Sequence, residues 1–283
     1  MKFRVFSELH YDVQAPSTII LNVHALRTPS QAVLKETLTL EPKLPYEEFE
    51  SQSGENRFVR LNTGKAKEVV IRYEALVERE HELIEHQKLT PVAVKRMDSS
   101  VIPFLFPSRY CQSDKLNRLA WKMFGEIADT YDRVAAVSDW IFDNVEYVRG
   151  STDAQTSAFD TITERSGVCR DFAHLGIALC RALTIPARYF TGYAHQLEPP
   201  DFHACFEAYI GERWLLFDAT RLAPLNGLVR IATGRDAADA AVATIFGAVT
   251  TRKMTVDCQP TEAGFKALRR TDLRDRGFSL DAA

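Results

Sequence analysis

The segment around Cys169 holds the residue best suited to covalent chemistry. Apolar residues recur at helical spacing after Cys169, Gly167 permits a tight turn before it, and Pro186 ends the pattern, which predicts a buried helix starting at Cys169. A thiol in the first turn of a helix faces unpaired N–H groups and the positive end of the helix dipole, which favour the thiolate and can stabilise an oxyanion. Cys169 is therefore a candidate nucleophile, although most free cysteines are buried packing residues without a chemical role.

His203 is the histidine best placed to act as a base. It begins the run HACFEAYI, in which side chains alternate in polarity or size, and WLLFDAT follows after Gly211, Glu212 and Arg213. Two short alternating runs separated by such a loop are typical of a β-hairpin, here over residues 203–220.

The register of this hairpin brings Asp218 toward His203. If Gly211 and Glu212 form a two-residue loop, Ile210 opposes Arg213, and Asp218 then lies opposite Cys205 and diagonal to His203. Diagonal neighbours are about 7–8 Å apart at their Cα atoms, within reach of an imidazole and a carboxylate that lean together. The pattern predicts that Asp218 orients His203, on condition that the register does not slip by one residue. The alternative for Asp218 is a turn or cap residue.

The other thiols and histidines lack such a context. Cys180 lies about 16 Å along the same predicted helix from Cys169 and is expected in the core. His174 points about 140° away from Cys169 around the helix and is interpreted as a packing residue. Cys111 and Cys258 have no neighbouring residues that suggest catalysis.

Composition excludes several classes of protein. The 283 residues are 46% hydrophobic and 26% charged, as in an average globular protein, and the net charge is −3, from 35 basic and 38 acidic residues. We therefore expect no broad surface for nucleic acid or for an anionic membrane. Charges interrupt the apolar runs of the N-terminus, which predicts a cytoplasmic protein, and no stretch predicts a membrane span. Five cysteines at irregular spacing argue against a disulfide framework and a structural zinc site.

Two domains are predicted, with a boundary near residue 100. Residues 1–100 contain short β-type runs and predict a small β-sandwich, and a proline-containing stretch follows at 90–107. Residues 101–283 begin with helical periodicity and form the second predicted domain. The expected strands are 3–13, 18–26, 32–40, 58–61 and 69–77.

The motifs in this second domain resemble the core of the transglutaminase-like superfamily. The segments GVCRDFAHLGIALCRALTIPARYFTGY and DFHACFEAYIGERWLLFDAT are similar to the family's G-V-C helix start, I-P-A-R strand, H-A strand and W-x-x-x-D strand. PSRYCQSDKL and GLVRIATGRDAADAA are similar to bacterial members described as candidate cysteine proteases, which carry a β-rich N-terminal domain.

This resemblance implies a fold and a set of roles. The fold is α+β, a papain-like, transglutaminase-core domain with helices packed on an antiparallel sheet, preceded by a β-sandwich-like N-terminal domain. Cys169 would be the nucleophile, His203 the general base and Asp218 the residue that orients it.

Two features near these residues leave alternatives open. Cys205 stands where relatives often have an aromatic residue, and it is either a small apolar filler that enlarges the pocket or a redox partner of Cys169. The Cys169 backbone N–H is the first candidate oxyanion donor, and the second is Tyr147 or Trp140, both of which could instead be core aromatics.

Several charged residues are expected to be structural. Asp171 suits the first turn of the helix and Arg170 pairs with an acid nearby. Arg230, Arg235 and Asp236 belong either to a loop and helix cap over the site or to a solvated surface.

The predicted chemistry is acyl transfer to Cys169 through a thioester, on a peptide bond or a glutamine amide. Water as the second substrate gives a cysteine protease or amidase, and an amine gives a transglutaminase. The sequence predicts no cofactor and no metal, because it contains no calcium-loop motif and no clustered histidine and acidic ligands. The expected partner is a protein or peptide substrate, with the oligomeric state left open. The alternative is a non-catalytic peptide-binding module, which the desolvation cost of burying three unused polar residues disfavours.

Overall fold

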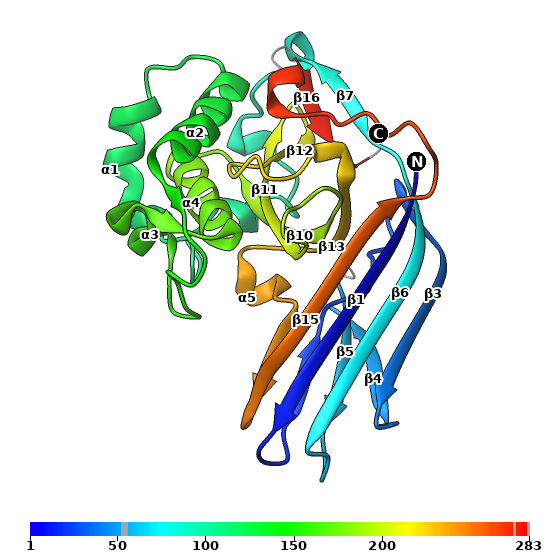
Figure 1. Ribbon diagram of the computed structural model, residues 1–283. Coiled ribbons are helices and arrows are strands. Elements are labelled where there is room, and N and C mark those ends of the chain that lie inside the picture. The colour runs from blue at the N-terminus through cyan, green and yellow to red at the C-terminus, as the bar shows by residue number, and fades with distance from the viewer. Residues whose placement is uncertain (52–55, 274–275, 282–283) are drawn as a thin grey trace.

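The computed structural model describes residues 1–51, 56–273 and 276–281. Two four-stranded antiparallel sheets form a sandwich, and a third antiparallel sheet carries a group of helices on one side (Figure 1). The chain is thus an α+β protein, and the predicted fold class is confirmed.

The sandwich arises from strands whose side chains alternate between the core and solvent. In β1, every second residue from Phe3 to Tyr11 is buried, as expected for a strand with one face on a core. In spatial order, the first sheet contains β15 (Val249–Pro260), β1 (Lys2–Val13), β6 (Glu68–Arg79) and β3 (Gln31–Glu41). The second sheet contains β14 (Ala243–Phe246), β2 (Thr18–Leu21), β5 (Arg57–Asn62) and β4 (Tyr46–Glu50).

Strands from the C-terminal half of the chain complete both sheets of the sandwich. β15 pairs with β1 from Phe3 opposite Pro260 to Val13 opposite Val249, and β14 pairs with β2. The predicted boundary near residue 100 accounts for β1 to β6, but β14 and β15 lie beyond it in the sequence. The sandwich therefore contains strands from both halves of the chain, and Figure 1 shows β1 and β15 side by side.

The helical unit surrounds one long buried helix. Its sheet has the spatial order β12 (Arg213–Phe217), β11 (Phe202–Ile210), β10 (Ala187–Ala194) and β13 (Leu228–Gly234). The helices are α1 (Ser113–Phe124), α2 (Thr130–Asn144), α3 (Ala158–Glu164), α4 (Cys169–Ala182) and α5 (Ala237–Ala240). Two short two-stranded sheets pair β8 (Glu146–Tyr147) with β9 (Ser166–Gly167) and β7 (Glu82–Glu85) with β16 (Arg276–Ser279).

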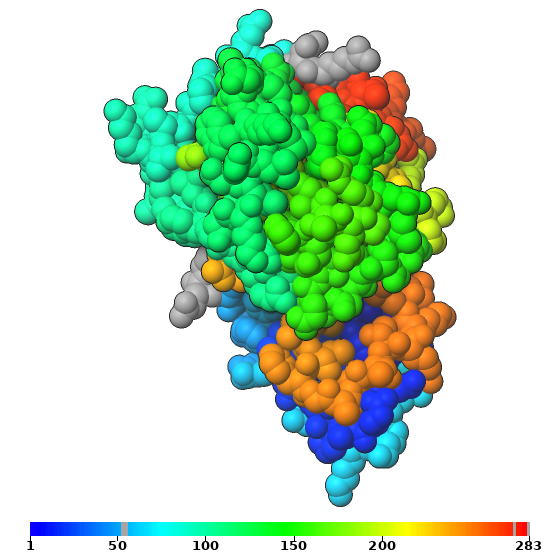
Figure 2. All heavy atoms as spheres, turned by 90° about the vertical axis from the view of Figure 1, so that its left-hand side faces the viewer, coloured from blue at the N-terminus to red at the C-terminus, as the bar shows by residue number. Residues whose placement is uncertain are grey.

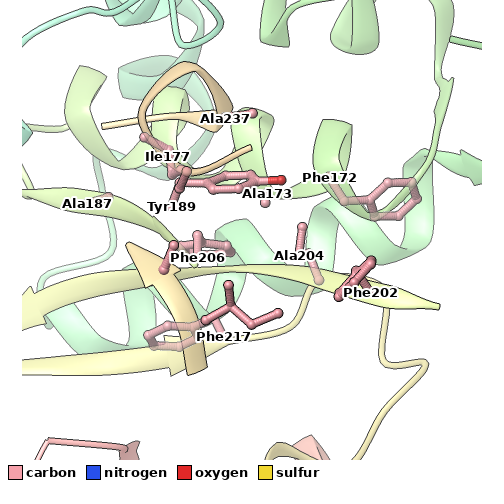
Figure 3. Packing of buried hydrophobic residues seen from close by; sticks show 14 of the residues in the cluster. Phe172, Ala173, Ile177, Ala187, Tyr189, Phe202, Ala204, Phe206, Phe217 and Ala237 are labelled. Carbon is pink, nitrogen blue, oxygen red and sulfur yellow. The ribbon is translucent and has the colours of Figure 1, made fainter. Parts of the chain in front are cut away.

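Helix α4 packs directly on β10 and β11 because the face that it turns toward the sheet carries small residues. Ala173 and Gly176 face the sheet, and a Cβ atom at Gly176 would lie 2.5 Å from the ring of Phe206. Figure 3 shows this contact layer, with Phe206 and Ala204 of β11 beneath Ala173 and Ile177 of α4. The close packing holds the start of α4 in a fixed position relative to β11.

The proline-containing stretch at 90–107 forms two short 3-10 turns, Val94–Arg96 and Ile102–Leu105, and no long element. Three more such turns lie at His86–Lys88, Leu225–Gly227 and Arg270–Leu273. Among the described residues, no helix reaches the length and apolarity needed to cross a lipid bilayer.

Candidate active site

Cys169 is the first residue of α4, as predicted, and a buried carboxylate holds the backbone at the residue before it. Asp171 accepts hydrogen bonds from the Val168 N–H at 2.9 Å and the Thr152 hydroxyl at 2.8 Å, and it forms an ion pair with Arg170. A Cβ atom at Gly167 would lie 2.8 Å from the Asp171 Cβ, so the turn before the helix requires glycine. Asp171 therefore caps the helix whose first turn carries the candidate nucleophile.

His203 and Asp218 form a buried hydrogen-bonded pair. Their Nε2 and Oδ2 atoms are 2.9 Å apart, and the second Asp218 oxygen accepts the Thr220 N–H at 2.9 Å and the Thr220 hydroxyl at 2.7 Å. The observed hairpin pairs Ile210 with Arg213, so the predicted register is confirmed. Asp218 follows the last residue of β12 and reaches His203 from that position.

The remaining ring nitrogen of His203 is left for the thiol. Nδ1 is buried and has no hydrogen-bond partner among the described residues in ordinary geometry. The Cys169 thiol lies close enough to the imidazole to favour its protonated form. Because Asp218 occupies Nε2, Nδ1 is the nitrogen available to take the thiol proton.

The electrostatics favour a charged imidazole. Burial alone would lower the pKa of His203, but the Asp218 carboxylate and the nearby thiols outweigh it and raise this pKa well above 6.5. Burial alone would raise the pKa of Asp218, but the charge and hydrogen bond of His203 and the Thr220 hydrogen bonds keep this pKa below its usual value. The pair is therefore poised to carry an imidazolium beside Cys169.

Tyr147 rather than Trp140 lies at the nucleophile. The Tyr147 hydroxyl interacts with the backbone N–H of Cys169, and burial followed by the nearby thiol raises its pKa. Trp140 instead contacts Phe124 and Arg165. The sequence left these two aromatic residues equivalent, and only the fold distinguishes them.

Cys205 also lies at the His203–Asp218 pair. One ligand-type atom from each of these three residues lies within 4.8 Å of the other two, as expected from the predicted hairpin register, in which Cys205 lies opposite Asp218. Burial and then the Asp218 charge raise the pKa of the Cys205 thiol to about 12, so this thiol is neutral. A second such group, His86, Asp129 and Asp132, lies nearer the surface.

The other charged or polar residues that the sequence singled out have structural roles. Arg230 forms ion pairs with the buried Glu207 and with Asp281. Asp236 caps α5 through the Ala238 N–H and also accepts the Tyr110 N–H. Arg235 pairs with Asp239 on the surface.

His174 is the packing residue that was predicted, with one additional contact. Its ring stacks on Tyr110, and its Nε2 accepts the Ala237 N–H at 3.1 Å. Burial lowers the pKa of His174 well below 6.5, so the ring is neutral and Nε2 can accept this hydrogen bond.

Cys169 and His203 open onto a cleft of about 570 Å³. One wall includes Tyr189 and Thr191 of β10, and the other wall is the segment from α5 to β14, of which Ala237, Ala238 and residues 240–245 line the cleft. Cys169 is the half-buried thiol of the chain, and the other four free cysteines are buried. The candidate nucleophile is thus the thiol that a substrate can reach.

The comparisons with known proteins cover both parts of the chain. Residues 1–100 match the family described as the bacterial transglutaminase N-terminal domain, and residues 117–219 match the transglutaminase-like superfamily. A solved structure of a candidate cysteine protease from Cytophaga hutchinsonii is 57% identical, with a TM-score of 0.97 over 99% of this chain and 98% of that chain. The chain belongs to the transglutaminase-like superfamily. The family match at 117–219 contains Cys169, His203 and Asp218.

Curated relatives within the family are matched over shorter lengths. An uncharacterized protein of Mycobacterium leprae is 29% identical over 116 residues, which are 38% of this chain and 42% of that protein. An uncharacterized protein of Mycobacterium tuberculosis is 40% identical over 60 residues, which are 21% of this chain and 19% of that protein. The match thus spans less than half the length of these relatives.

Proposed function

We propose that the protein is a thiol-dependent acyl-transfer enzyme that acts on peptide or glutamine amide bonds of a protein or peptide substrate. The observation that supports this most is the line of contacts from Cys169 through His203 to Asp218, in which Cys169 and His203 line an open cleft. Nucleophile, base and orienting carboxylate are the groups that acyl transfer needs.

The reaction follows from the positions of these groups. The Cys169 thiol gives its proton to Nδ1 of His203, and the thiolate adds to the amide carbonyl carbon. The tetrahedral oxyanion collapses as the C–N bond breaks, and the imidazolium protonates the leaving amine, which leaves a thioester on Cys169. Water or an amine, deprotonated by His203, then attacks the thioester and releases the acid or a new amide together with the free thiol.

Two donors are available for the oxyanion in this proposal. The Cys169 N–H and the Tyr147 hydroxyl interact with each other in the free protein, and an oxyanion between them would accept from both. We expect Tyr147→Phe to reduce kcat by about 10²-fold, the effect of losing one oxyanion donor in other enzymes.

Mass spectrometry of β-casein incubated with a labelled primary amine tests the reaction. Cys169→Ala is compared with Cys180→Ala, the same substitution at a buried thiol farther along α4. Amine adducts or deamidation of β-casein that Cys169→Ala abolishes and Cys180→Ala does not would indicate glutamine-directed chemistry. Cleavage of the β-casein chain that only Cys169→Ala abolishes would indicate a protease.

Alkylation separates an enzyme from a binding module. Iodoacetamide at pH 6 is expected to modify Cys169 selectively, because the imidazolium stabilises its thiolate. Equal inertness of all five thiols would contradict catalysis and favour a non-catalytic peptide-binding module.

We also propose that the protein works in the cytoplasm, supported by its five free thiols, which a reducing compartment preserves. Fractionation of the host cells with antibody detection tests this, and recovery in a periplasmic or secreted fraction would contradict it.

A further inference from the structure

The wall of the cleft opposite β10, from α5 to β14, is a fixed piece of backbone. On one side, the Ala237 N–H donates to His174, and the Thr191 hydroxyl donates to the Ala240 carbonyl at 3.0 Å. On the other side, the Asn22 N–H donates to the Val242 carbonyl at 2.8 Å, and β14 continues this pairing with β2. The wall is thus attached to both units, and neither family match includes it.

β14 is an edge strand whose outer backbone groups are unpaired. The bond from Asn22 to Val242 fixes which residues face β2: Val242 and Thr244 do, and Ala243 and Ile245 point their N–H and C=O groups away. No hydrogen bond within the described part of the chain uses the main-chain groups of Ala243 or Ile245. A free edge of this kind pairs readily with another strand.

This free edge borders the cleft that contains Cys169. The cleft is lined by Val242, Ala243, Thr244 and Ile245 in succession. Side chains of consecutive strand residues point to opposite faces, so a cavity that touches all four follows the edge of the strand and not one of its faces. Figure 2 shows the orange segment of the chain, which includes β14, at the surface between the green helical unit and the blue sandwich.

We propose that the substrate is an extended polypeptide segment that adds to the free edge of β14 as a further strand. Ala243 and Ile245 would each exchange main-chain hydrogen bonds with it, and the amide that reacts would lie over Cys169. The alanines of the wall, including Ala237 and Ala241, leave room for the peptide backbone between the two walls. This inference rests on the proposed function and narrows its substrate to unfolded or locally extended chains.

Affinity labels that carry a peptide test the inference without a known substrate. Bromoacetyl-tetra-alanyl-lysine amide and acetyl-tetra-alanyl chloromethyl ketone extend the peptide in the two directions from Cys169, and bromoacetamide is the reference without a peptide. We expect at least one peptide reagent to alkylate Cys169 about tenfold faster than bromoacetamide, the gain from a few backbone hydrogen bonds.

A proline substitution removes one of the proposed hydrogen bonds and keeps the strand. Ile245→Pro deletes an N–H that points away from β2, a position that tolerates proline in edge strands. Ile245→Pro should lower, by about tenfold, the ratio of the Cys169 alkylation rate with the peptide reagent to that with bromoacetamide. Ile245→Ala keeps the N–H and should lower the ratio less than about threefold. Equal ratios in the wild type and Ile245→Pro would overturn the inference.

N-methylation of the reagent tests the same bonds from the peptide side. Methyl groups at successive peptide nitrogens should slow alkylation at every second position, because a paired strand directs alternate N–H groups to its neighbour. This readout uses the wild-type protein and holds even if Ile245→Pro does not fold. If a methyl group slowed alkylation equally at every peptide nitrogen, this would contradict pairing with β14.

The reference reagent separates the two proposals. If bromoacetamide itself fails to modify Cys169 at pH 6, the proposed function fails. If bromoacetamide reacts and no peptide reagent gains rate, only the edge-strand inference fails.

Discussion

At the scale of single residues, Asp218 sets the charge of His203. Both side chains are buried, and the carboxylate offsets the desolvation that would otherwise keep the imidazole neutral. Because the folded pKa of His203 is raised, the imidazolium persists from acidic pH up to that raised value and is lost as the pH rises through it. We expect this raised pKa of His203 to set the upper pH limit of the thiolate–imidazolium pair as well.

Asp218→Asn is expected to move this limit to lower pH. Without the negative charge, the pKa of His203 falls, and the rate of acyl transfer should fall by about 10²-fold or more. The pH dependence of Cys169 alkylation by iodoacetamide measures the change. Asp201→Asn, which removes a nearby carboxylate that makes no hydrogen bond to the ring, should move the limit less. An unaltered pH profile in Asp218→Asn would contradict the role of Asp218.

Cys205 contacts the same pair, but its neutral, buried thiol fits a packing role. We expect Cys205→Ala to keep acyl-transfer activity within a few-fold and to lower the free energy of unfolding by about 1 kcal/mol, the cost of a small cavity. Urea denaturation and peroxide inactivation check this. If Cys205→Ala made peroxide inactivation irreversible where the wild type recovers with dithiothreitol, a redox partnership with Cys169 would replace the packing role.

At the scale of elements, the contact between α4 and β11 places Cys169 opposite His203. The contact depends on Gly176, where the ring of Phe206 occupies the space of a side chain. A glycine inside a helix costs about 1 kcal/mol relative to alanine, so its presence here indicates that close packing outweighs helix propensity.

Gly176→Ala is therefore expected to destabilise the protein, against the trend for helices. Overpacking costs about 1–3 kcal/mol, and a shift of α4 would separate the thiol from the imidazole and lower the alkylation rate of Cys169. Thermal unfolding and alkylation measure the two effects. Adding Phe206→Leu to the Gly176→Ala protein should restore part of the stability and part of the alkylation rate of Cys169. A Gly176→Ala protein more stable than the wild type would show that the contact is loose.

At the scale of the whole molecule, the sandwich depends on strands from both halves of the chain. β1 lies between β6 and β15, and β15 comes from residues 249–260. The same returning chain forms the wall of the cleft, as α5 and β14, before it continues into β15. Folding of the N-terminal domain and formation of the cleft are thus coupled through residues 237–260.

A fragment of residues 1–100 is expected to lack a stable sandwich. It contains β1 and β2 but not their partners β15 and β14, so it exposes the long edge of β1 and the short edge of β2. Circular dichroism and size-exclusion chromatography should show an unfolded or aggregated chain, and residues 241–261 attached by a flexible linker should restore a cooperative transition. Cooperative folding of the fragment alone would contradict this dependence.

The sequence by itself determined the elements that carry the candidate site. Helical periodicity placed Cys169 at a helix start, and the alternating runs around the Gly211–Glu212 loop fixed the register of His203 and Asp218. These signals are local, because they depend on residues a few positions apart. The strand β4 was missed, since its side chains are almost all exposed and show no apolar alternation.

Only the tertiary structure decided what surrounds the site. The pairing of β14 and β15 with strands more than 200 positions away and the position of Tyr147, rather than Trp140, beside Cys169 depend on contacts between distant segments. Such contacts arise from the packing of whole elements, and no periodicity within a single segment encodes them. The sequence thus singled out the candidate reactive groups, and the fold supplied the cleft and the free strand edge beside them.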